Sequence, residues 1–261
     1  LSYVRIDCGL DLAEMERVSR EAVDRNLPLL AGDEDVTLWH VISRGERYPS
    51  PRSGPPTVAI YAYPLEFSRF ARSYVEGVIL VTPGIRRIPP QCLEAKAKIT
   101  NKMNHAMATF EAKQVDPRAI PLMLDLDGNL TETDTTNFFF VRDGRLCTPT
   151  DRNVLGGITR QALFDLAADM GLEVEEGNFT PYDVYTAEEA FLSGTSGSIQ
   201  PVQSLNGAVV GDGSLPGPVT LGIMRAWNDM VGIDCVAQAL GHLGDNESKD
   251  LLGRWETYLA A

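Results

Sequence analysis

Strand-like and helix-like runs alternate along this chain, and that alternation constrains its fold more than any other feature. Residues 11–26 place apolar side chains at helical spacing, whereas β-branched and aromatic residues dominate 36–44 and 57–63. Further strands are expected at 77–83, 120–126, 137–142 and 190–194, and further helices at 94–114, 159–170 and from about 218. The pattern predicts an α+β fold.

A stretch with two adjacent prolines, GIRRIPPQCL at 84–93, reads as a break between two lobes. We therefore expect a small N-terminal α+β domain over 1–84, an interdomain linker over 85–93, and a large domain over 94–261 that ends in a helical tail. The cleft between two lobes is the default position for a ligand. Because the chain starts at Leu1 and enters helical sequence at once, we expect the first domain to lack upstream residues.

The charge balance narrows the choice of partners. The 261 residues carry a net charge of −13, whereas nucleic acids and anionic membranes are bound by basic faces. The sequence contains no apolar run of 18 residues and nothing that resembles a signal peptide. We therefore expect a soluble, cytoplasmic protein that binds neither nucleic acid nor membrane.

The cysteines and histidines show no metal-ligand spacing. Cys8, Cys92, Cys147 and Cys235 lie far apart, and a chain of this size does not need disulfides. We expect free, buried thiols and no metal site.

Lysine is used sparingly, and most of it is clustered. Four of the five lysines, Lys96, Lys98, Lys102 and Lys113, fall within 18 residues. An amine can lose its proton, which a guanidinium does not do, so a retained lysine suggests chemistry. A solvated helix face would give the same cluster, and the spacing alone does not choose among the four.

Two glycine-containing turns are candidate phosphate sites. LGGITR at 155–160 places two glycines before a helix start, where free N–H groups and the positive helix end attract anions. GTSGS at 194–198 offers hydroxyls and backbone N–H groups after a buried strand. Each could equally be a plain turn.

Glu132 lies just past a turn and five residues before the very apolar run at 137–142. If buried, its carboxylate needs a cationic or protonated partner, and an exposed loop acid is the alternative. An amine, a carboxylate and two phosphate-seeking turns together are the parts of a pyridoxal-phosphate site. There the lysine forms a Schiff base and the acid keeps the ring nitrogen protonated.

The order of these motifs resembles the class IV (fold type IV) pyridoxal-phosphate aminotransferases. That family includes branched-chain and D-amino acid aminotransferases, (R)-selective amine transaminases and aminodeoxychorismate lyase. The matching stretches are 98–113, 124–149, 154–176 and 188–207. The resemblance implies the two-lobed, D-amino acid aminotransferase-like fold, pyridoxal 5'-phosphate as cofactor, and a homodimer.

The resemblance also implies roles for single residues. Lys98 matches the Schiff-base lysine, because Asn101 and Glu111 follow it at the family's spacing. Glu132 matches the acid that pairs with the pyridine nitrogen. The remaining matches are Leu155 under the ring, Gly157, Ile158 and Thr159 at the phosphate-binding helix start, Thr195 as a second phosphate contact, and Ser196 and Gly197 as backbone donors to the substrate carboxylate.

Some positions depart from the family. Lys102 stands where branched-chain enzymes carry tyrosine, and Thr136 where many members carry Glu. The loop after 36–44 lacks the Arg-x-His arrangement of D-amino acid enzymes, and the family's phosphate-binding arginine lies in an upstream segment that this sequence does not contain.

The implied activity is transfer of an amino group between a branched-chain-like amino acid or an amine and a 2-oxo acid. Three alternatives remain: a lyase acting on an aminated chorismate, a cofactor-binding protein without catalysis, and a non-catalytic interaction domain.

Overall fold

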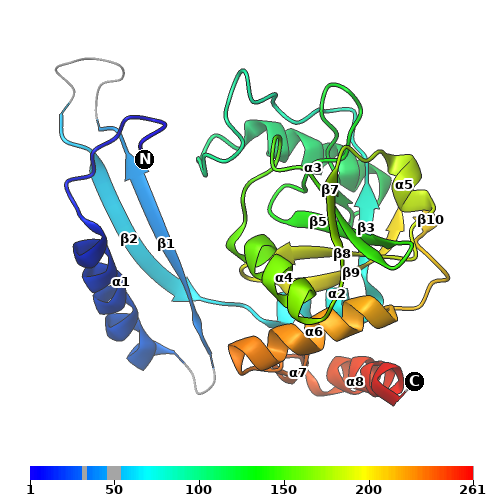
Figure 1. Ribbon diagram of the computed structural model, residues 1–261. Helices are drawn as coiled ribbons and strands as arrows, with labels where there is room; N and C mark the ends of the chain where they lie inside the picture. Colours follow the sequence, from blue (N-terminus) through cyan, green and yellow to red (C-terminus); the bar gives the residue numbers. More distant parts are fainter. Residues whose placement is uncertain (31–33, 46–53, 261) are drawn as a thin grey trace. The chain divides into compact units, whose positions relative to one another are not determined.

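A computed structural model describes residues 1–30, 34–45 and 54–260, which form two compact units, Leu1–Glu66 and Phe67–Ala261 (Figure 1). The loop expected to lack an Arg-x-His arrangement lies largely outside the described residues. Each unit has its own hydrogen-bonded sheet.

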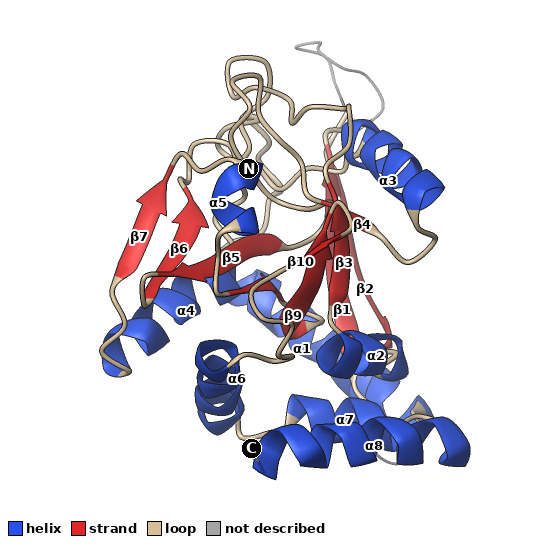
Figure 2. Ribbon diagram, turned by 90° about the vertical axis from the view of Figure 1, so that its right-hand side faces the viewer, coloured by secondary structure: helices blue, strands red, loops and turns tan. Residues whose placement is uncertain are grey.

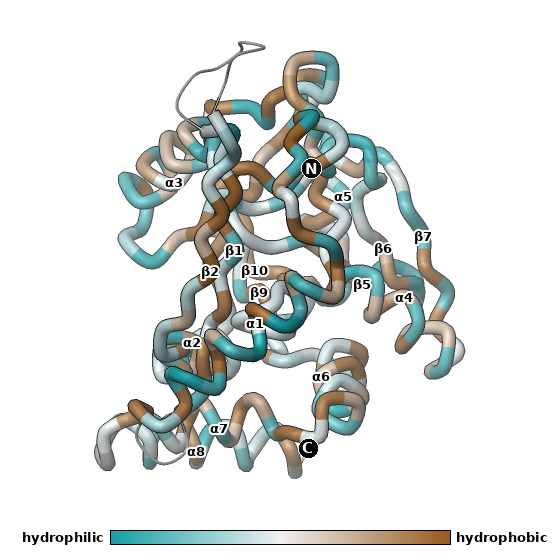
Figure 3. Tube along the Cα trace, turned by 90° about the vertical axis from the view of Figure 1, so that its left-hand side faces the viewer, coloured by the Kyte–Doolittle hydropathy of each residue, from teal (hydrophilic) through white to brown (hydrophobic). Residues whose placement is uncertain are grey.

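The first unit is a helix packed on a two-stranded sheet. Helix α1 (Leu12–Asn26) is capped by Asp11, whose carboxylate accepts from the Glu14 N–H at 2.8 Å. After the short 3-10 helix η1 (Leu27–Leu29), strands β1 (Val36–Ser43) and β2 (Thr57–Pro64) pair antiparallel, and α1 packs on β2. Hydrophobic segments along β1 and β2 contrast with hydrophilic ones along α1 (Figure 3). The expected helix and two strands are confirmed.

The second unit is built on a mixed sheet. Its strands are β3 (Val78–Val81), β4 (Ile120–Pro121), β5 (Asn137–Arg142), β6 (Arg145–Pro149), β7 (Val174–Gly177), β8 (Glu189–Gly194), β9 (Ser198–Leu205) and β10 (Ala208–Val209). In the described part of the chain the order is β4-β3-β9-β8-β5-β6-β7, with β10 on β9 (Figure 2). Because β3 pairs with β4 and β9, residues 67–84 belong to this unit, and the division falls at 66/67 rather than after residue 84.

Helices cover this sheet. They are α2 (Ser68–Glu76), α3 (Met103–Val115), α4 (Ile158–Asp169), α5 (Pro181–Tyr185), α6 (Pro218–Val231), α7 (Cys235–Gly241) and α8 (Asp245–Ala260). Helices α4 and α6 contact β8, α2 contacts β9, and α3 contacts β3 and β4. No helix formed by the described residues is both long and apolar enough to cross a membrane.

Two sequence expectations were wrong in extent. The helix expected at 94–114 begins only at Met103, and turns closed by short-range bonds such as Ala97 N–H to Glu94 O at 3.2 Å precede it. Lys98 therefore lies in an irregular segment. The strand expected at 120–126 ends at Pro121, and the Asp125 carboxylate forms a turn four residues later by accepting the Asp127 and Asn129 N–H groups.

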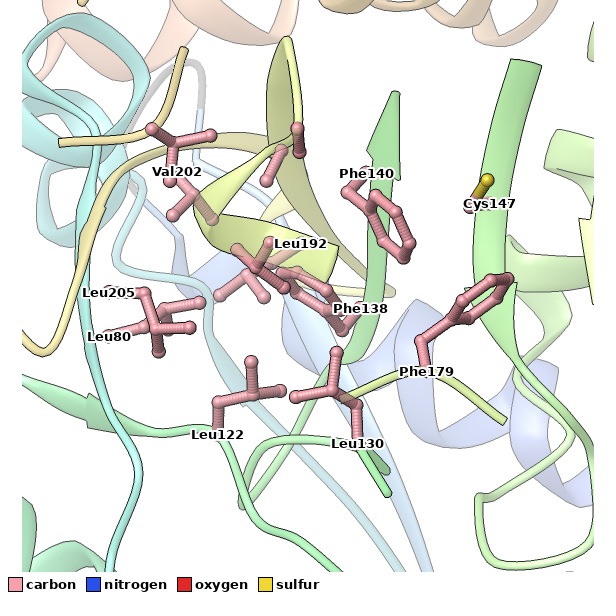
Figure 4. Packing of buried hydrophobic residues seen from close by; sticks show 14 of the residues in the cluster. Leu80, Leu122, Leu130, Phe138, Phe140, Cys147, Phe179, Leu192, Val202 and Leu205 are labelled. Atoms are coloured by element: carbon pink, nitrogen blue, oxygen red, sulfur yellow. The ribbon is translucent and has the colours of Figure 1, made fainter. Parts of the chain in front are cut away.

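Strand β5 is buried on both faces, as its unbroken apolar run predicts. Phe138 and Phe140 point into the main core, where the Phe140 ring meets Phe179 edge-on at 4.9 Å (Figure 4). Phe139 points to the other face and stacks on Phe191 of β8 at 5.2 Å. This rigid strand begins five residues after Glu132 and fixes the end of the loop that carries it.

The four cysteines all lie within the described residues and are free, as expected. Their expected burial holds only for Cys147, because Cys92 is exposed and Cys8 and Cys235 are partly exposed.

Replacing Phe140 by Ala should destabilise the second unit by about 3–5 kcal/mol, because it opens a cavity in a close-packed core. Urea denaturation followed by intrinsic fluorescence measures the loss. Phe110→Ala is the control, since that ring is 62% exposed. Equal effects of the two substitutions would contradict the described core.

Candidate active site

A pocket opens in the second unit between the segment 87–105 and the loops that carry Glu132 and Leu155. The empty space around it is about 350 Å³ with the open solvent at its mouth included, and the part that can hold the centre of a water molecule is about 20 Å³. Its lining residues are Arg87, Leu93, Glu94, Ala95, Ala97, Lys98, Ile99, Asn101, Lys102, His105, Glu132 and Leu155. The pocket therefore joins the lysine cluster to the predicted acid.

Glu132 is 5% exposed, and both of its carboxylate oxygens accept hydrogen bonds. Oε1 accepts from Arg87 at 3.2 Å from Nε and 3.0 Å from Nη2, and Oε2 accepts from the Leu155 N–H at 2.8 Å. The expectation that this acid needs a cationic partner when buried is confirmed. Arg87 is that partner, and sequence reasoning missed it. The available signal was an arginine pair in the proline-containing stretch.

Helix α3 and the hairpin before Glu132 hold the Arg87 backbone in place. The Arg87 N–H donates to the Leu124 carbonyl at 2.8 Å. From α3, Asn104 Nδ2 donates to the Arg86 carbonyl at 2.8 Å, and Glu111 Oε2 accepts from the Ile85 N–H at 3.1 Å. These three hydrogen bonds hold the backbone of residues 85–87.

Burial raises the pKa of Glu132 above its ordinary value. The positive charge of Arg87, the Leu155 N–H and Lys102 oppose this shift. The site is therefore a buried acid whose charged form depends on its cationic neighbours.

The clustered lysines separate in the structure. Lys96 forms an exposed ion pair with Asp151 at 2.8 Å, and Lys113 is exposed in the last turn of α3. Lys98 and Lys102 both line the pocket. Although Lys102 keeps contact with solvent, burial lowers its pKa, and Arg87 and Lys98 lower it further against the opposing charge of Glu132.

His105, in the first turn of α3, is a second lining residue that sequence reasoning missed. It is 5% exposed, and neither ring nitrogen has a hydrogen-bond partner among the described residues. Burial, and then the charges of Lys102 and Arg87, lower its pKa to about 4, so the imidazole is neutral near pH 7.

Asn137 at the start of β5 ties the glycine turn to the acid. Its Nδ2 donates to the Leu155 carbonyl at 2.9 Å and lies 3.5 Å from Glu132 Oε2. A Cβ on Gly157 would lie 2.3 Å from Asn137 Oδ1, so only glycine fits at this position. Helix α4 starts at the next residue without a side-chain cap; there Ile158 is 86% exposed and Thr159 is buried.

The turn between β8 and β9 exposes Thr195 and Ser196 and buries Gly197. The Tyr74 hydroxyl of α2 donates to the Gly197 carbonyl at 3.1 Å and anchors the turn. Of the residues predicted from the sequence, Lys98, Glu132 and Leu155 line the pocket, whereas Gly157, Ile158, Thr159, Thr195, Ser196 and Gly197 do not. Among the described residues, no three His, Cys, Asp or Glu side chains gather as metal ligands would.

Replacing Arg87 by Met should destabilise the protein by about 3–5 kcal/mol at neutral pH, because the Glu132 carboxylate stays buried without its cation. Since the native pKa of Glu132 is raised, the folded state binds the proton more tightly than the unfolded chain does. Stability is therefore lost as pH rises through the native pKa, and Arg87→Met should deepen that loss. Urea denaturation at several pH values measures it. The double variant Arg87→Met/Glu132→Gln should recover most of the stability, and no recovery would refute the pairing.

His105 should make the stability of the protein depend on pH in the opposite sense. Its native pKa of about 4 lies below that of the unfolded chain, so stability should fall as pH drops from 6.5 towards 4, by up to about 3 kcal/mol. Denaturation at pH 7 and pH 5 tests this. His105→Leu should remove that component, and His40→Leu, at an exposed position, should retain it. A pH dependence unchanged in His105→Leu would count against a buried neutral imidazole.

Comparisons with known proteins identify the family of this chain. The family model for amino-transferase class IV matches residues 3–205. The branched-chain-amino-acid aminotransferase-like protein 1 of Arabidopsis thaliana is 35% identical over 154 residues, which is 59% of this chain but 27% of that protein. This chain thus spans about a quarter of that curated relative.

Two solved structures share the fold. The branched-chain amino acid aminotransferase of Escherichia coli superposes with a TM-score of 0.78 at 27% identity, over 94% of this chain and 77% of that one. The Thermobaculum terrenum branched-chain amino acid aminotransferase in PLP-form superposes with a TM-score of 0.74 at 26% identity, over 88% of this chain and 74% of that one. The fold type IV architecture expected from the sequence is therefore confirmed, and the chain belongs to the class IV aminotransferase family.

Proposed function

We propose that this protein is a pyridoxal-phosphate-dependent aminotransferase that moves an amino group between a branched-chain-like amino acid, or an amine, and a 2-oxo acid. The observation that carries the proposal is that Lys98 and the buried acid Glu132 line one pocket. Membership of the class IV family and the PLP-form of the T. terrenum relative support it.

The residues of the pocket fit this cofactor. Lys98 offers an amine in contact with solvent, Leu155 offers apolar surface, and Glu132 offers a buried carboxylate. A carboxylate has about four lone-pair positions, so Glu132 can accept a ring N–H in addition to Arg87 and the Leu155 N–H. Bound pyridoxal phosphate supplies an aldehyde to which amines add and a ring that withdraws electrons when protonated.

Each residue then has a defined task. Lys98 would hold the cofactor through Nζ, and its free amine would carry a proton to and from the substrate carbon. Glu132, which is paired with Arg87, would hold the ring nitrogen protonated. This pairing explains why a buried acid is retained beside the pocket.

The remaining residues predicted from the sequence would hold the negative groups. Gly157, Ile158 and Thr159 present the uncapped start of α4 to the phosphate, with Thr195 as a second contact. The N–H groups of Ser196 and Gly197 would bind the substrate carboxylate. On the family resemblance alone, we also propose a cytoplasmic homodimer.

Replacing Lys98 by Ala should abolish both the visible absorbance of bound cofactor and turnover, because the amine that attaches the cofactor is gone. Absorbance spectra of purified protein reconstituted with pyridoxal phosphate measure this. Lys113→Ala, at an exposed position of α3, should keep both signals. Cofactor absorbance that persists in Lys98→Ala would overturn the assignment.

Product analysis with and without a 2-oxo acid separates the transferase from a lyase that uses the same lysine. An aminotransferase needs the acceptor for more than one turnover, and sustained turnover without it would contradict the proposal.

A further inference from the structure

Two basic side chains in the pocket have no task in the reaction described above. Lys102 lies at the N-terminal boundary of α3 and His105 lies three residues later, so both belong to one face of that helix. Both line the pocket together with Arg87, Lys98 and Glu132.

Lys102 is a cation that has no ion pair of its own. Among the described residues, no carboxylate lies within ion-pair distance of its amine. Glu132 is already bound by Arg87 and by the Leu155 N–H. The Lys102 side chain is exposed; its partial burial and the charges of Arg87 and Lys98 oppose its positive charge, whereas Glu132 and Asp134 favour it. A bound negative group would offset these costs.

His105 is equally unsatisfied. The residue is 5% exposed, yet neither ring nitrogen has a hydrogen-bond partner among the described residues. Buried polar atoms without partners are rare in folded proteins, and each calls for an explanation. Because the imidazole is neutral, one nitrogen donates and the other accepts. It can therefore bind a ligand beside an ammonium group without adding charge.

We propose that Lys102, supported by His105, binds an anionic oxygen of the ligand that fills this pocket. The inference rests on the proposed function and adds to it a recognition pair that does no covalent chemistry. The anionic oxygen has two available sources, the phenolate oxygen of pyridoxal phosphate and a second carboxylate on the amino-acid substrate. Both would place negative charge against the ammonium group of Lys102.

The test uses Lys102→Met, which keeps most of the length of the side chain and removes its charge, and Lys102→Arg, which keeps the charge. Lys113→Met is the matched control on the same helix, at an exposed position outside the pocket. The first arm titrates the apoprotein with pyridoxal phosphate and measures Kd from absorbance. The second arm compares KM for glutamate with KM for leucine.

If the cofactor supplies the oxygen, Lys102→Met should raise its Kd by about tenfold or more, which is the loss of one hydrogen bond to a charged group. If the substrate supplies the oxygen, the Kd for pyridoxal phosphate should stay unchanged. KM for glutamate should then rise by about tenfold or more, while KM for leucine should not change. In either case Lys102→Arg should recover most of the loss, and His105→Leu should shift the same constant in the same direction.

The role of Lys102 would be overturned if Lys102→Met had the same Kd and KM values as wild type and Lys113→Met. The role of His105 would be overturned if His105→Leu left these constants unchanged. Wild-type protein that shows no cofactor absorbance would refute the proposed function itself, which is a separate outcome. Thermal unfolding of each variant identifies a folding defect. If Lys102→Met does not fold, Lys102→Gln repeats the measurement with a polar, uncharged side chain.

Discussion

The ion pair between Arg87 and Glu132 is the contact on which the rest of the site depends. Arg87 Nη2 lies 3.0 Å from Glu132 Oε1, and both side chains are 7% exposed. Neither charge is therefore stable there without the other. The pair joins the proline-containing stretch to the loop before β5, and the Leu155 N–H joins the glycine turn to the same carboxylate. Three segments that are distant in sequence thus meet at one acid.

The surrounding scaffold keeps that meeting point rigid. β5 is buried on both faces by aromatic side chains and fixes Asn137, which holds the turn before α4 through the Leu155 carbonyl. On the other side, α3 fixes the backbone around Arg87 through Asn104 and Glu111. The acid is therefore preorganised by packing and hydrogen bonds, which is what a site for a charged aromatic cofactor requires.

The charge on the pocket wall is not evenly compensated. Arg87 is neutralised by Glu132, whereas Lys98 and Lys102 face the same space. Under the proposed function Lys98 attaches the cofactor, which leaves Lys102 as the cation available for recognition. An acidic protein with a net charge of −13 can thus present a locally basic pocket, because pocket charge is set by a few side chains and not by the total.

The sequence by itself determined the alternation of elements, the apolar strand at β5 and the candidates Lys98, Glu132 and Leu155, because these depend on local periodicity and on ordered motifs. It also indicated that a buried Glu132 would need a cation. Only the tertiary structure decided that this cation is Arg87, that residues 67–84 join the large sheet, and that the helix after the prolines starts at Met103. It also placed His105, which no motif marked, in the pocket wall. The physical reason is that pairing between β3 and β9 and the burial of single side chains are contacts across long stretches of chain. Local pattern predicts which residues can make such contacts, and packing selects their partners.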